Sequence, residues 1–245
     1  MRLSGKTVVV TGASRGLGLG ISKVFAAEGA AVAMLARGKA ELELAGAEVP
    51  NALTLVCDVA DPSSVRAAFA EIEAKLGGVD VLINNAAVAT PQRVEALDDA
   101  KAQLEINVNI LGPLYCMREA ISSMRQCGGG DIINISSESV VNHYPYLSLY
   151  AATKSALETL SGAMRAELTG TNIRVTVYRS GRVASTFGRD WDAEVTTQVR
   201  AAARSSGFEE RSGGAVSPEV PARAMLELVL LDRTARVDML QLRGA

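Results

Sequence analysis

The sequence predicts an α/β fold in which a parallel sheet is covered by helices on both faces. Short apolar runs rich in valine and isoleucine alternate with longer segments whose apolar residues recur at helical spacing. The runs are almost continuously apolar, which is typical of strands buried on both faces of a parallel sheet. A glycine-rich turn comes directly after the first run. These observations indicate a Rossmann-type, doubly wound sheet of about seven strands.

Seven apolar runs are the candidate strands of this sheet. They cover residues 7–10, 31–35, 53–57, 79–84, 131–135, 173–178 and 237–242. Helical patterns lie between them, and those at residues 100–126 and 150–168 are apolar over more of their circumference than one sheet contact requires. Because such sheets bind ligands at the carboxyl ends of their strands, the residues that follow each run are the candidate functional residues.

Length and composition limit the classes of protein to consider. Residues 1–245 are enough for one domain with a large core, and a hydrophobic content of 48% with only 7 prolines fits a helix-packed parallel sheet. The formal net charge is −2, and no basic stripe favours nucleic acid. No run reaches membrane-spanning length or resembles a membrane-surface helix. We expect a soluble cytoplasmic protein without nucleic-acid or membrane partners.

The metal-ligating residue types are sparse. Cys57, Cys116 and Cys127 lie far apart and lack metal-ligand spacing with His143, the single histidine. We therefore expect no metal site, and cysteines that are simply buried apolar residues of a reduced compartment.

The glycine-rich turn at residues 11–18 leads from the first strand into a helix. Glycines let the backbone approach a pyrophosphate closely, and the helix N-terminus presents free N–H groups. The spacing Gly-x3-Gly-x-Gly differs from the usual dinucleotide fingerprint, so a plain strand-to-helix connection is the alternative. The position after the first strand favours dinucleotide binding by Gly12, Ser14, Arg15, Gly16, Leu17 and Gly18.

The end of the second strand bears on the choice of cofactor. Sheets that prefer NAD carry an acid there to hold the ribose, whereas this chain has Ala36 and Arg37. Arg37 and Arg15 could together bind a 2′-phosphate, since guanidinium groups pair well with phosphate. The sequence therefore favours NADP(H), with NAD(H) possible if both arginines are ordinary surface charges.

Polar residues follow the next three strands. Asp58, with Val59 beside it, could accept a hydrogen bond from an adenine amino group, and Asn85 and Ala86 are suited to tying strand ends together beside a cofactor. Each could also be an ordinary turn or cap residue. Ser137 places a hydroxyl at the end of the fifth strand.

Tyr150 and Lys154 begin the helical pattern that follows. Four positions apart, they lie on one face of a helix, where the ammonium could lower the pKa of the phenol toward neutrality. Such pairs are common on amphipathic helices, where they usually have no catalytic role.

The glycine loop, the segment Asn84-Asn85-Ala86, Ser137 and Tyr150-x3-Lys154 occur in this order, and together they resemble the short-chain dehydrogenase/reductase family. The resemblance covers the chain up to about Thr186, and the family also uses a Gly-x3-Gly-x-Gly loop. It implies that Tyr150 is the general acid/base and that Ser137 hydrogen-bonds the substrate oxygen. It further implies that Lys154 binds the nicotinamide ribose and assists the tyrosine.

The resemblance also implies roles for residues that have no signal of their own. The family's asparagine in Asn-x-x-Gly falls on Asn109, because Asn107 lacks this spacing to a glycine. Val183 and the hydroxyl of Ser185 or Thr186 are expected at the cofactor carboxamide, and Ser136 is expected to cap or orient its neighbour. Helices such as those at residues 100–126 and 150–168 form subunit interfaces in the family, so a homodimer or homotetramer is expected.

Two positions depart from the family pattern. Ala87 stands where a glycine is usual, and Ser180 stands where a proline is usual. The second change leaves the loop after the sixth strand less rigid, and the arginines on either side of it, Arg179 and Arg182, are unexpected.

Substrate contacts are expected from two variable segments. His143 and Tyr144 lie between the serine and the tyrosine, and Trp191 and Phe208 lie in the long segment 186–217, which is predicted to be a lid. Four arginines hint at an anionic substrate group, although a solvated helix face is the simpler interpretation: Arg182, Arg189, Arg200 and Arg204.

The predicted function is NADP(H)-dependent reduction of a ketone or aldehyde to an alcohol, a reaction on a small molecule. An alcohol dehydrogenase that works oxidatively with the same residues is the first alternative. The second is a non-catalytic NADP(H)-binding protein, which would have no need of Ser137, Tyr150 and Lys154 together.

Overall fold

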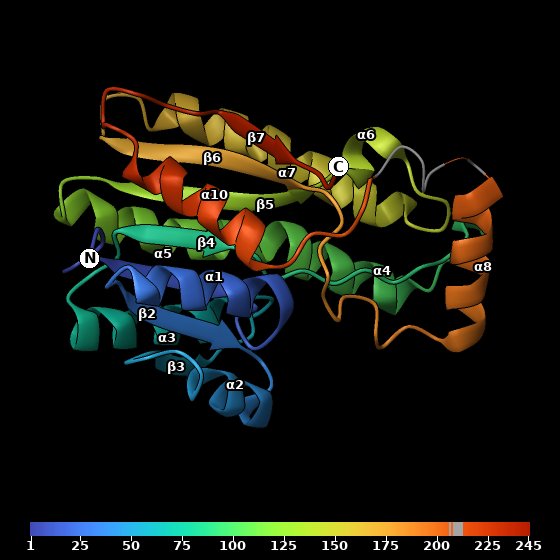
Figure 1. The fold of residues 1–245 in the computed structure, drawn as a ribbon, viewed down its shortest axis with the longest axis horizontal. Coiled ribbons are helices and arrows are strands. Elements are labelled where there is room, and N and C mark those ends of the chain that lie inside the picture. Colours follow the sequence, from blue (N-terminus) through green and yellow to red (C-terminus); the bar gives the residue numbers. More distant parts are fainter. Residues whose placement is uncertain (206, 208–212) are drawn as a thin grey trace.

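Seven parallel strands form one sheet in the computed structural model of the chain (Figure 1). They are β1 (Thr7–Thr11), β2 (Ala31–Ala36), β3 (Leu53–Val56), β4 (Val81–Asn84), β5 (Gly130–Ser137), β6 (Ile173–Ser180) and β7 (Met239–Leu242). Their order is β3-β2-β1-β4-β5-β6-β7, which confirms the predicted fold class. The structure describes residues 1–245 except 206 and 208–212, so Phe208 of the predicted lid lies outside the described residues.

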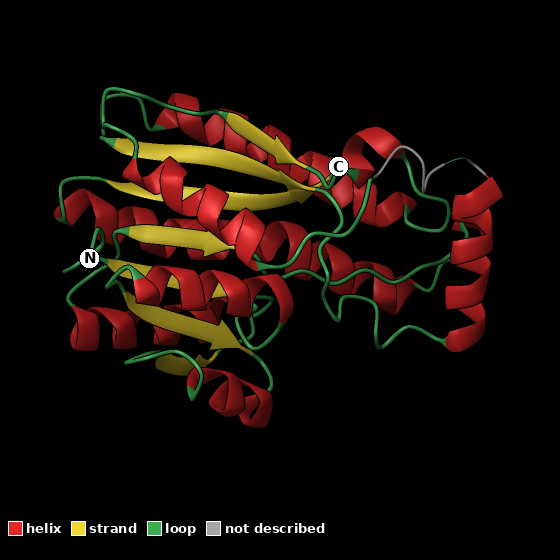
Figure 2. Cartoon of the chain, viewed as in Figure 1, coloured by secondary structure: helices red, strands yellow, loops and turns green. Residues whose placement is uncertain are grey.

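Helices cover both faces of the sheet. One face carries α1 (Gly16–Ala27), α2 (Lys39–Gly46) and α10 (Glu219–Leu230), and the other carries α3 (Pro62–Leu76), α5 (Gly112–Gln126) and α7 (Ser148–Glu167). The shorter segments are η1 (Val94–Ala96), α4 (Asp99–Ile106), η2 (Asn107–Leu111), α6 (Ser139–Asn142) and α8 (Ala193–Ser205). Helix α8 lies beyond the carboxyl ends of the strands, at the right of Figure 2.

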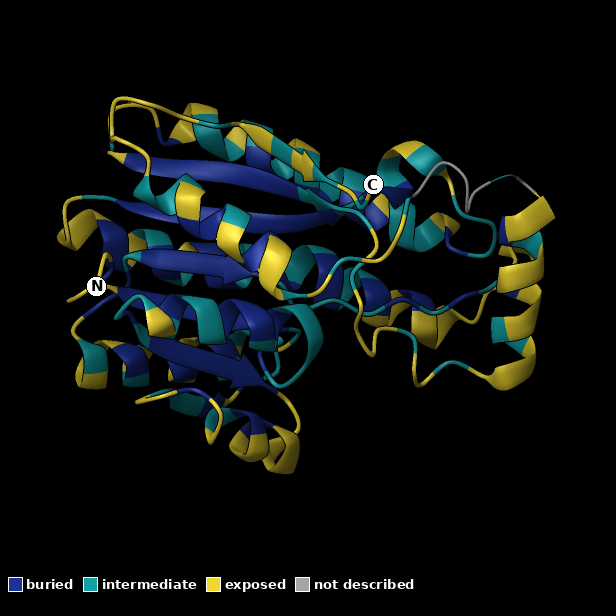
Figure 3. Ribbon diagram, in the orientation of Figure 1, coloured by how far each residue is buried: buried dark blue, intermediate teal, exposed yellow. Residues whose placement is uncertain are grey.

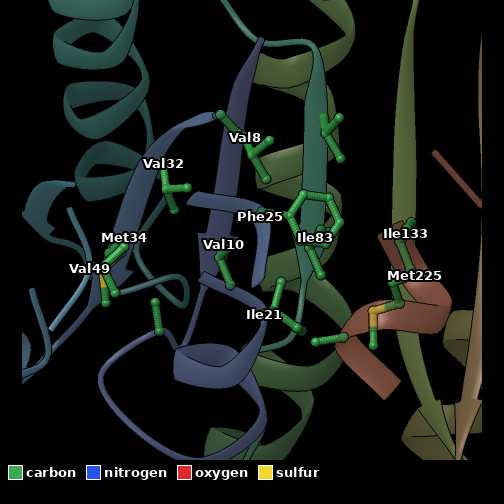
Figure 4. Packing of buried hydrophobic residues seen from close by; sticks show 14 of the residues in the cluster. Val8, Val10, Ile21, Phe25, Val32, Met34, Val49, Ile83, Ile133 and Met225 are labelled. Atoms are coloured by element: carbon green, nitrogen blue, oxygen red, sulfur yellow. The ribbon is translucent and has the colours of Figure 1, made fainter. Parts of the chain in front are cut away.

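The core forms two layers because successive strand residues point to opposite faces. Val8 and Val10 of β1 pack with Ile21, Phe25 and Met225 on one face, as Figure 4 shows, while Val9 joins the cluster on the other face. The central strands are almost wholly buried (Figure 3). Each such side chain stabilises the fold by roughly 1.5–3 kcal/mol relative to an exposed one.

The seven predicted strands are all present, and their ends differ from the predicted ones by no more than two residues. The helical segment 100–126 was expected to be continuous but is divided into α4, η2 and α5. A π-helical turn, η2, interrupts it, and such turns often lie at functional sites. Among the described residues no helix combines the length and apolar character that a membrane span needs.

A buried arginine joins the end of α10 to the sheet. Arg174 of β6 has a side chain only 9% exposed, and its Nε donates to Asp131 Oδ1 at 2.6 Å. Its remaining nitrogens donate to main-chain carbonyl oxygens of Leu228, Val229, Leu231, Asp232 and Ala235 at 3.1–3.4 Å. The guanidinium thus binds carbonyl groups at and just after the end of a helix, where they lack the full set of intrahelical hydrogen bonds.

Candidate active site

A cavity of about 950 Å³ lies at the carboxyl ends of the strands. Most predicted site residues line it: Gly12, Ser14, Arg15, Gly16, Leu17, Arg37, Asp58, Val59, Asn85, Ala86, Ser137, Tyr144, Tyr150, Lys154, Val183, Ser185 and Trp191. Gly18, Asn109 and His143 do not line it. The sheet therefore brings together residues that lie up to 179 positions apart, from Gly12 to Trp191.

The glycine loop is held tightly against the next strand. Gly12 has φ +64°, a conformation that side chains rarely adopt. A Cβ atom on Gly18 would lie 2.3 Å from Gly12 O and 2.6 Å from Asn85 Nδ2. Gly18 therefore serves the close packing of the loop and does not face the cavity. Helix α1 begins at Gly16 without a side-chain cap, so its first N–H groups are available to an anion.

Asn85 and Thr11 join the ends of β4 and β1. Asn85 Nδ2 donates to Thr11 O at 2.8 Å and to Gly12 O at 3.2 Å, while Thr11 Oγ1 accepts from the main-chain nitrogens of Asn85 and Ala86 at 2.9 and 3.0 Å. The amide side chain of Asn85 thus fixes the glycine loop, as the sequence suggested for this segment. Ala87, at the position where glycine is usual, also lines the cavity.

The two arginines at the far end of the cavity have different surroundings. Arg37 is exposed and lines the cavity. Arg15 Nη2 lies 3.2 Å from Asp190 Oδ2, and Arg189 forms an ion pair with Glu41. Segment 186–192, the start of the predicted lid, is thereby connected to the glycine loop and to α2. Because all these side chains are substantially exposed, the pairs contribute little to stability.

Ser137, Tyr150 and Lys154 meet at the other end of the cavity. Lys154 is only 2% exposed, and its Nζ donates to Ile135 O at 2.8 Å and lies 5.8 Å from the centroid of the Tyr150 ring. Ser137 Oγ accepts from Ser139 N at 3.1 Å, and the Ser137 hydroxyl is near enough to Tyr150 to act on the pKa of the phenol. A hydroxyl, a phenol and an ammonium thus converge from β5 and α7.

Burial determines the protonation of this group. It raises the pKa of Tyr150 to about 12, although the Ser137 hydroxyl acts in the opposite direction. Burial lowers the pKa of Lys154 to about 8. At neutral pH the phenol is therefore protonated and suited to donating a proton, and the lysine carries a positive charge beside it.

Asn109 lies behind this group, within η2. Its Nδ2 donates to Val88 O at 2.8 Å and to Thr153 Oγ1 at 3.1 Å, and its Oδ1 accepts from Val88 N at 2.9 Å. The side chain is fully buried and joins the segment after β4 to α7. In this structure Asn109 positions its neighbours and does not reach the cavity. Asn107 accepts from Gln103 instead.

The neighbours of Ser180 explain the first unexpected arginine. Arg179 Nη2 lies 2.6 Å from Glu158 Oε2, and both side chains are less than 15% exposed. Ser136 Oγ donates to the same carboxylate at 2.6 Å. Arg179 and Ser136 therefore form a buried ionic network with Glu158. Ser136 and Ser137 both line the cavity, but the hydroxyl of Ser136 donates to this carboxylate.

Several cavity residues were not found from the sequence. The ring of Phe187 lies 5.7 Å from that of Tyr150 and 6.0 Å from that of Trp191, measured between centroids. Trp191 Nε1 donates to Ala89 O at 2.7 Å. Phe187 had no periodic or motif signal, because only the folded segment brings it over the tyrosine.

The predicted substrate residues do not share one location. Tyr144 donates from its hydroxyl to Oε1 of the buried Glu138 at 2.9 Å and lines the cavity, whereas His143 is exposed and lies outside the lining. Of the four arginines, Arg182, Arg189 and Arg200 line the cavity, and Arg204 is not among its lining residues. In the described part of the chain, no group of three or more His, Cys, Asp or Glu residues could hold a metal ion.

Comparison with known proteins places this geometry in a family. Residues 6–196 match the short chain dehydrogenase family. The chain is 36% identical over 188 residues to galactitol 2-dehydrogenase (L-tagatose-forming) of Cereibacter sphaeroides, covering 75% of this chain and 74% of that protein. It is 32% identical over 201 residues to a short chain dehydrogenase of Pseudocercospora fijiensis, but spans only 64% of that protein's length.

Solved structures give the same result. An alcohol dehydrogenase from the archaeon Thermococcus sibiricus, complexed with 5-hydroxy-NADP, superposes with a TM-score of 0.81 at 28% identity, covering 97% of this chain and 96% of that one. A 3-ketoacyl-(acyl-carrier-protein) reductase from Brucella melitensis, complexed with NADH, has a TM-score of 0.85 at 25% identity, covering 99% and 98%. The chain belongs to the short-chain dehydrogenase/reductase family of oxidoreductases.

Proposed function

We propose that the chain reduces the carbonyl group of a small ketone or aldehyde to an alcohol, with NADP(H) as cofactor. The observation that carries the proposal is the convergence of Ser137, Tyr150 and Lys154 at one end of a cavity whose other end is the glycine loop. The raised pKa of Tyr150 supports the direction, because reduction needs a protonated phenol.

The cavity fits a dinucleotide. Gly12 and Gly18 leave no room for side chains at the point where the loop approaches Asn85, and the start of α1 offers free N–H groups. Arg37 and Arg15 would receive the 2′-phosphate, and Asp58 would receive the adenine amino group. Lys154 would hold the nicotinamide ribose. Solved relatives bound to 5-hydroxy-NADP and to NADH support a nicotinamide cofactor.

The chemistry follows from the protonation state of these residues. The cofactor, when bound, supplies the hydride. Tyr150 gives its proton to the developing alkoxide, and Ser137 donates a hydrogen bond to the same oxygen, so proton transfer and electrostatic stabilisation act on one atom. Lys154 stabilises the phenolate that remains. Tyr144, Trp191 and Phe187 would contact the rest of the substrate, with 186–217 acting as a lid.

The test is a spectrophotometric screen of NADPH and NADH oxidation against ketones, aldehydes, keto acids and keto esters. Tyr150→Phe should keep NADPH binding and lose turnover by a factor of about 10²–10⁴. Tyr115→Phe is the matched control, since Tyr115 does not line the cavity and should tolerate the change. A fully active Tyr150→Phe enzyme would refute the role of the phenol.

Oxidation of a polyol or sugar is the second candidate. It is favoured by the similarity to galactitol 2-dehydrogenase and to a D-xylose 1-dehydrogenase of Caulobacter vibrioides, to which the chain is 34% identical over 194 residues. Turnover of polyols with NADP⁺ or NAD⁺ that exceeds every reductive rate would establish it. NADPH binding without turnover in either direction would establish a non-catalytic binding protein.

We also infer that the protein is a homodimer or homotetramer. Leu97 and Leu104, beside and within α4, are 43% and 38% exposed, although both are apolar. Light scattering coupled to gel filtration would measure the mass of the particle directly, and a monomer at micromolar concentration would contradict this inference.

A further inference from the structure

Glu105 is a buried carboxyl group behind the reacting residues. It lies near the end of α4, one helical turn before Asn109, and is 0% exposed. Its Oε2 accepts from Thr90 N at 3.1 Å, while its Oε1 has no hydrogen-bond partner among the described residues. Burial of a carboxyl group costs free energy because the group loses its hydrogen bonds to water, and a single neutral donor replaces only part of them. No motif in the sequence distinguishes this residue.

The groups that face Glu105 are those of the active site. Helix α4 packs against α7, and the ionisable groups of α7 that interact with Glu105 are Lys154 and Tyr150. The segment after β4 contributes a main-chain donor, the N–H group of Thr90, which bonds to Glu105 Oε2. Burial raises the pKa of Glu105 to about 7, while the ammonium of Lys154 opposes this shift. The carboxylate in turn raises the pKa of both Lys154 and Tyr150.

We propose that Glu105 is a positioning residue, which holds the segment after β4 through Thr90 and keeps the Tyr150–Lys154 pair in its protonated form. This inference rests on the proposed reduction, because it concerns the proton that Tyr150 donates. Glu105 touches neither substrate nor cofactor, and it acts through the pair and the segment.

The sign of the electrostatic effect does not depend on which partner loses its proton. Loss of one proton takes the pair from a charge of +1 to zero, whether it leaves the phenol or the ammonium. A negative charge on Glu105 resists either loss. When Glu105 is ionised, Tyr150 therefore keeps the proton that it donates up to a higher pH. It also disfavours oxidation, which needs the phenol to accept a proton.

Helix α4 and the adjoining π-helical turn η2 hold the segment after β4 at two points. Asn109 binds the main chain of Val88, and Glu105 binds that of Thr90. Between them, Ala89 O accepts the indole N–H of Trp191. Glu105 thus fixes the main chain next to Ala89 O, the carbonyl oxygen that accepts a hydrogen bond from Trp191 of the predicted lid. The charge of Glu105 acts on Tyr150 and Lys154.

The test separates charge from support. Glu105→Gln keeps the shape of the side chain and an acceptor for Thr90 N but removes the charge, and Asp99→Asn removes a charge from the exposed first turn of the same helix as a control. The pKa of Lys154 is measured by NMR on protein with carbon-13-labelled lysine, with Lys154→Arg to assign the resonance. We expect this pKa to fall by about one pH unit in Glu105→Gln and to stay unchanged in Asp99→Asn.

The pH profile of kcat/KM gives a second readout that a merely structural role would not move. Below about pH 6, where Glu105 is protonated, wild type and Glu105→Gln should oxidise alcohol at similar rates. Above about pH 7, the variant should oxidise up to about tenfold faster, and it should lose reductive activity at lower pH. An equal loss at every pH, or an unchanged or higher pKa of Lys154, would overturn the proposal.

Wild type alone can decide the matter if the variant does not fold. The Lys154 resonance must then respond as labelled Glu105 ionises, because the two charges interact. A Lys154 resonance that does not respond to the ionisation of Glu105 would overturn the proposal. The NMR measurement needs no substrate, so failure of the proposed reaction would show as absent turnover while the Lys154 result still stood on its own.

Discussion

Gly18→Ala tests whether the close approach of the glycine loop to β4 is needed for cofactor binding. The new methyl group would lie 2.3 Å from Gly12 O, roughly 1 Å inside van der Waals contact. The loop must then move by a similar distance, which breaks its contact with Asn85. Displacing the loop should lower NADPH affinity about 10- to 100-fold, although alanine itself favours a helix by about 0.5–1 kcal/mol over glycine.

Gly162→Ala is the matched control, because Gly162 lies within α7 and a Cβ there meets only Arg165 Nη2 at 3.6 Å. That substitution should raise Tm by about 2–4 °C and leave NADPH affinity unchanged. Fluorescence titration with NADPH and thermal unfolding measure the two effects on both variants. If Gly18→Ala binds NADPH as wild type does and gains the same Tm, the steric reasoning is wrong.

Three further predictions concern stability and cofactor choice. Arg174→Met should lower the free energy of unfolding by about 1–3 kcal/mol in urea, because the main-chain carbonyl groups at the end of α10 lose their donor, while Asp131 keeps its ion pair with Arg233. Arg236→Met, at a side chain 55% exposed, should change the free energy of unfolding by less than about 0.5 kcal/mol. The pKa of Glu105 in the folded protein, about 7, exceeds its ordinary value of 4.5. The contribution of Glu105 to the free energy of unfolding is therefore complete below pH 4.5, and about 3 kcal/mol of stability is lost as the pH rises through 7. Urea unfolding of Glu105→Gln across that pH range should show a flatter dependence of stability on pH. Arg37→Gln should weaken NADPH binding about tenfold and leave NADH binding unchanged in a fluorescence titration, and equal losses for both would contradict a 2′-phosphate contact.

The strands could be predicted from the sequence because burial on both faces leaves a continuous apolar run, as in residues 7–10 and 173–178. Motif spacing likewise identified Ser137, Tyr150 and Lys154, which the structure brings to one end of the cavity. These features are local in sequence or have a fixed order along it.

Features that depend on contacts between distant segments could not be predicted. The π-helical turn at Asn107–Leu111 coincides with Asn109 binding the main chain of Val88, which helical periodicity does not reveal. Glu105 resembles an ordinary helical glutamate until α7 covers it. Arg179 was unexpected beside Ser180 in the sequence, and the structure pairs it with Glu158 on a helix 21 positions earlier.

The indole of Trp191 gives this protein an internal optical probe. It is the single tryptophan of the chain. It donates a hydrogen bond to Ala89 O and packs edge-on against Phe187, whose ring lies 5.7 Å from that of Tyr150. Its emission overlaps the absorption of a reduced nicotinamide, so energy transfer would quench it when the cofactor binds. Opening of the segment would move the indole from a carbonyl into water and shift its emission to the red. Cofactor binding and segment motion can therefore be followed separately, in the unmodified protein, at the speed of a stopped-flow mixer.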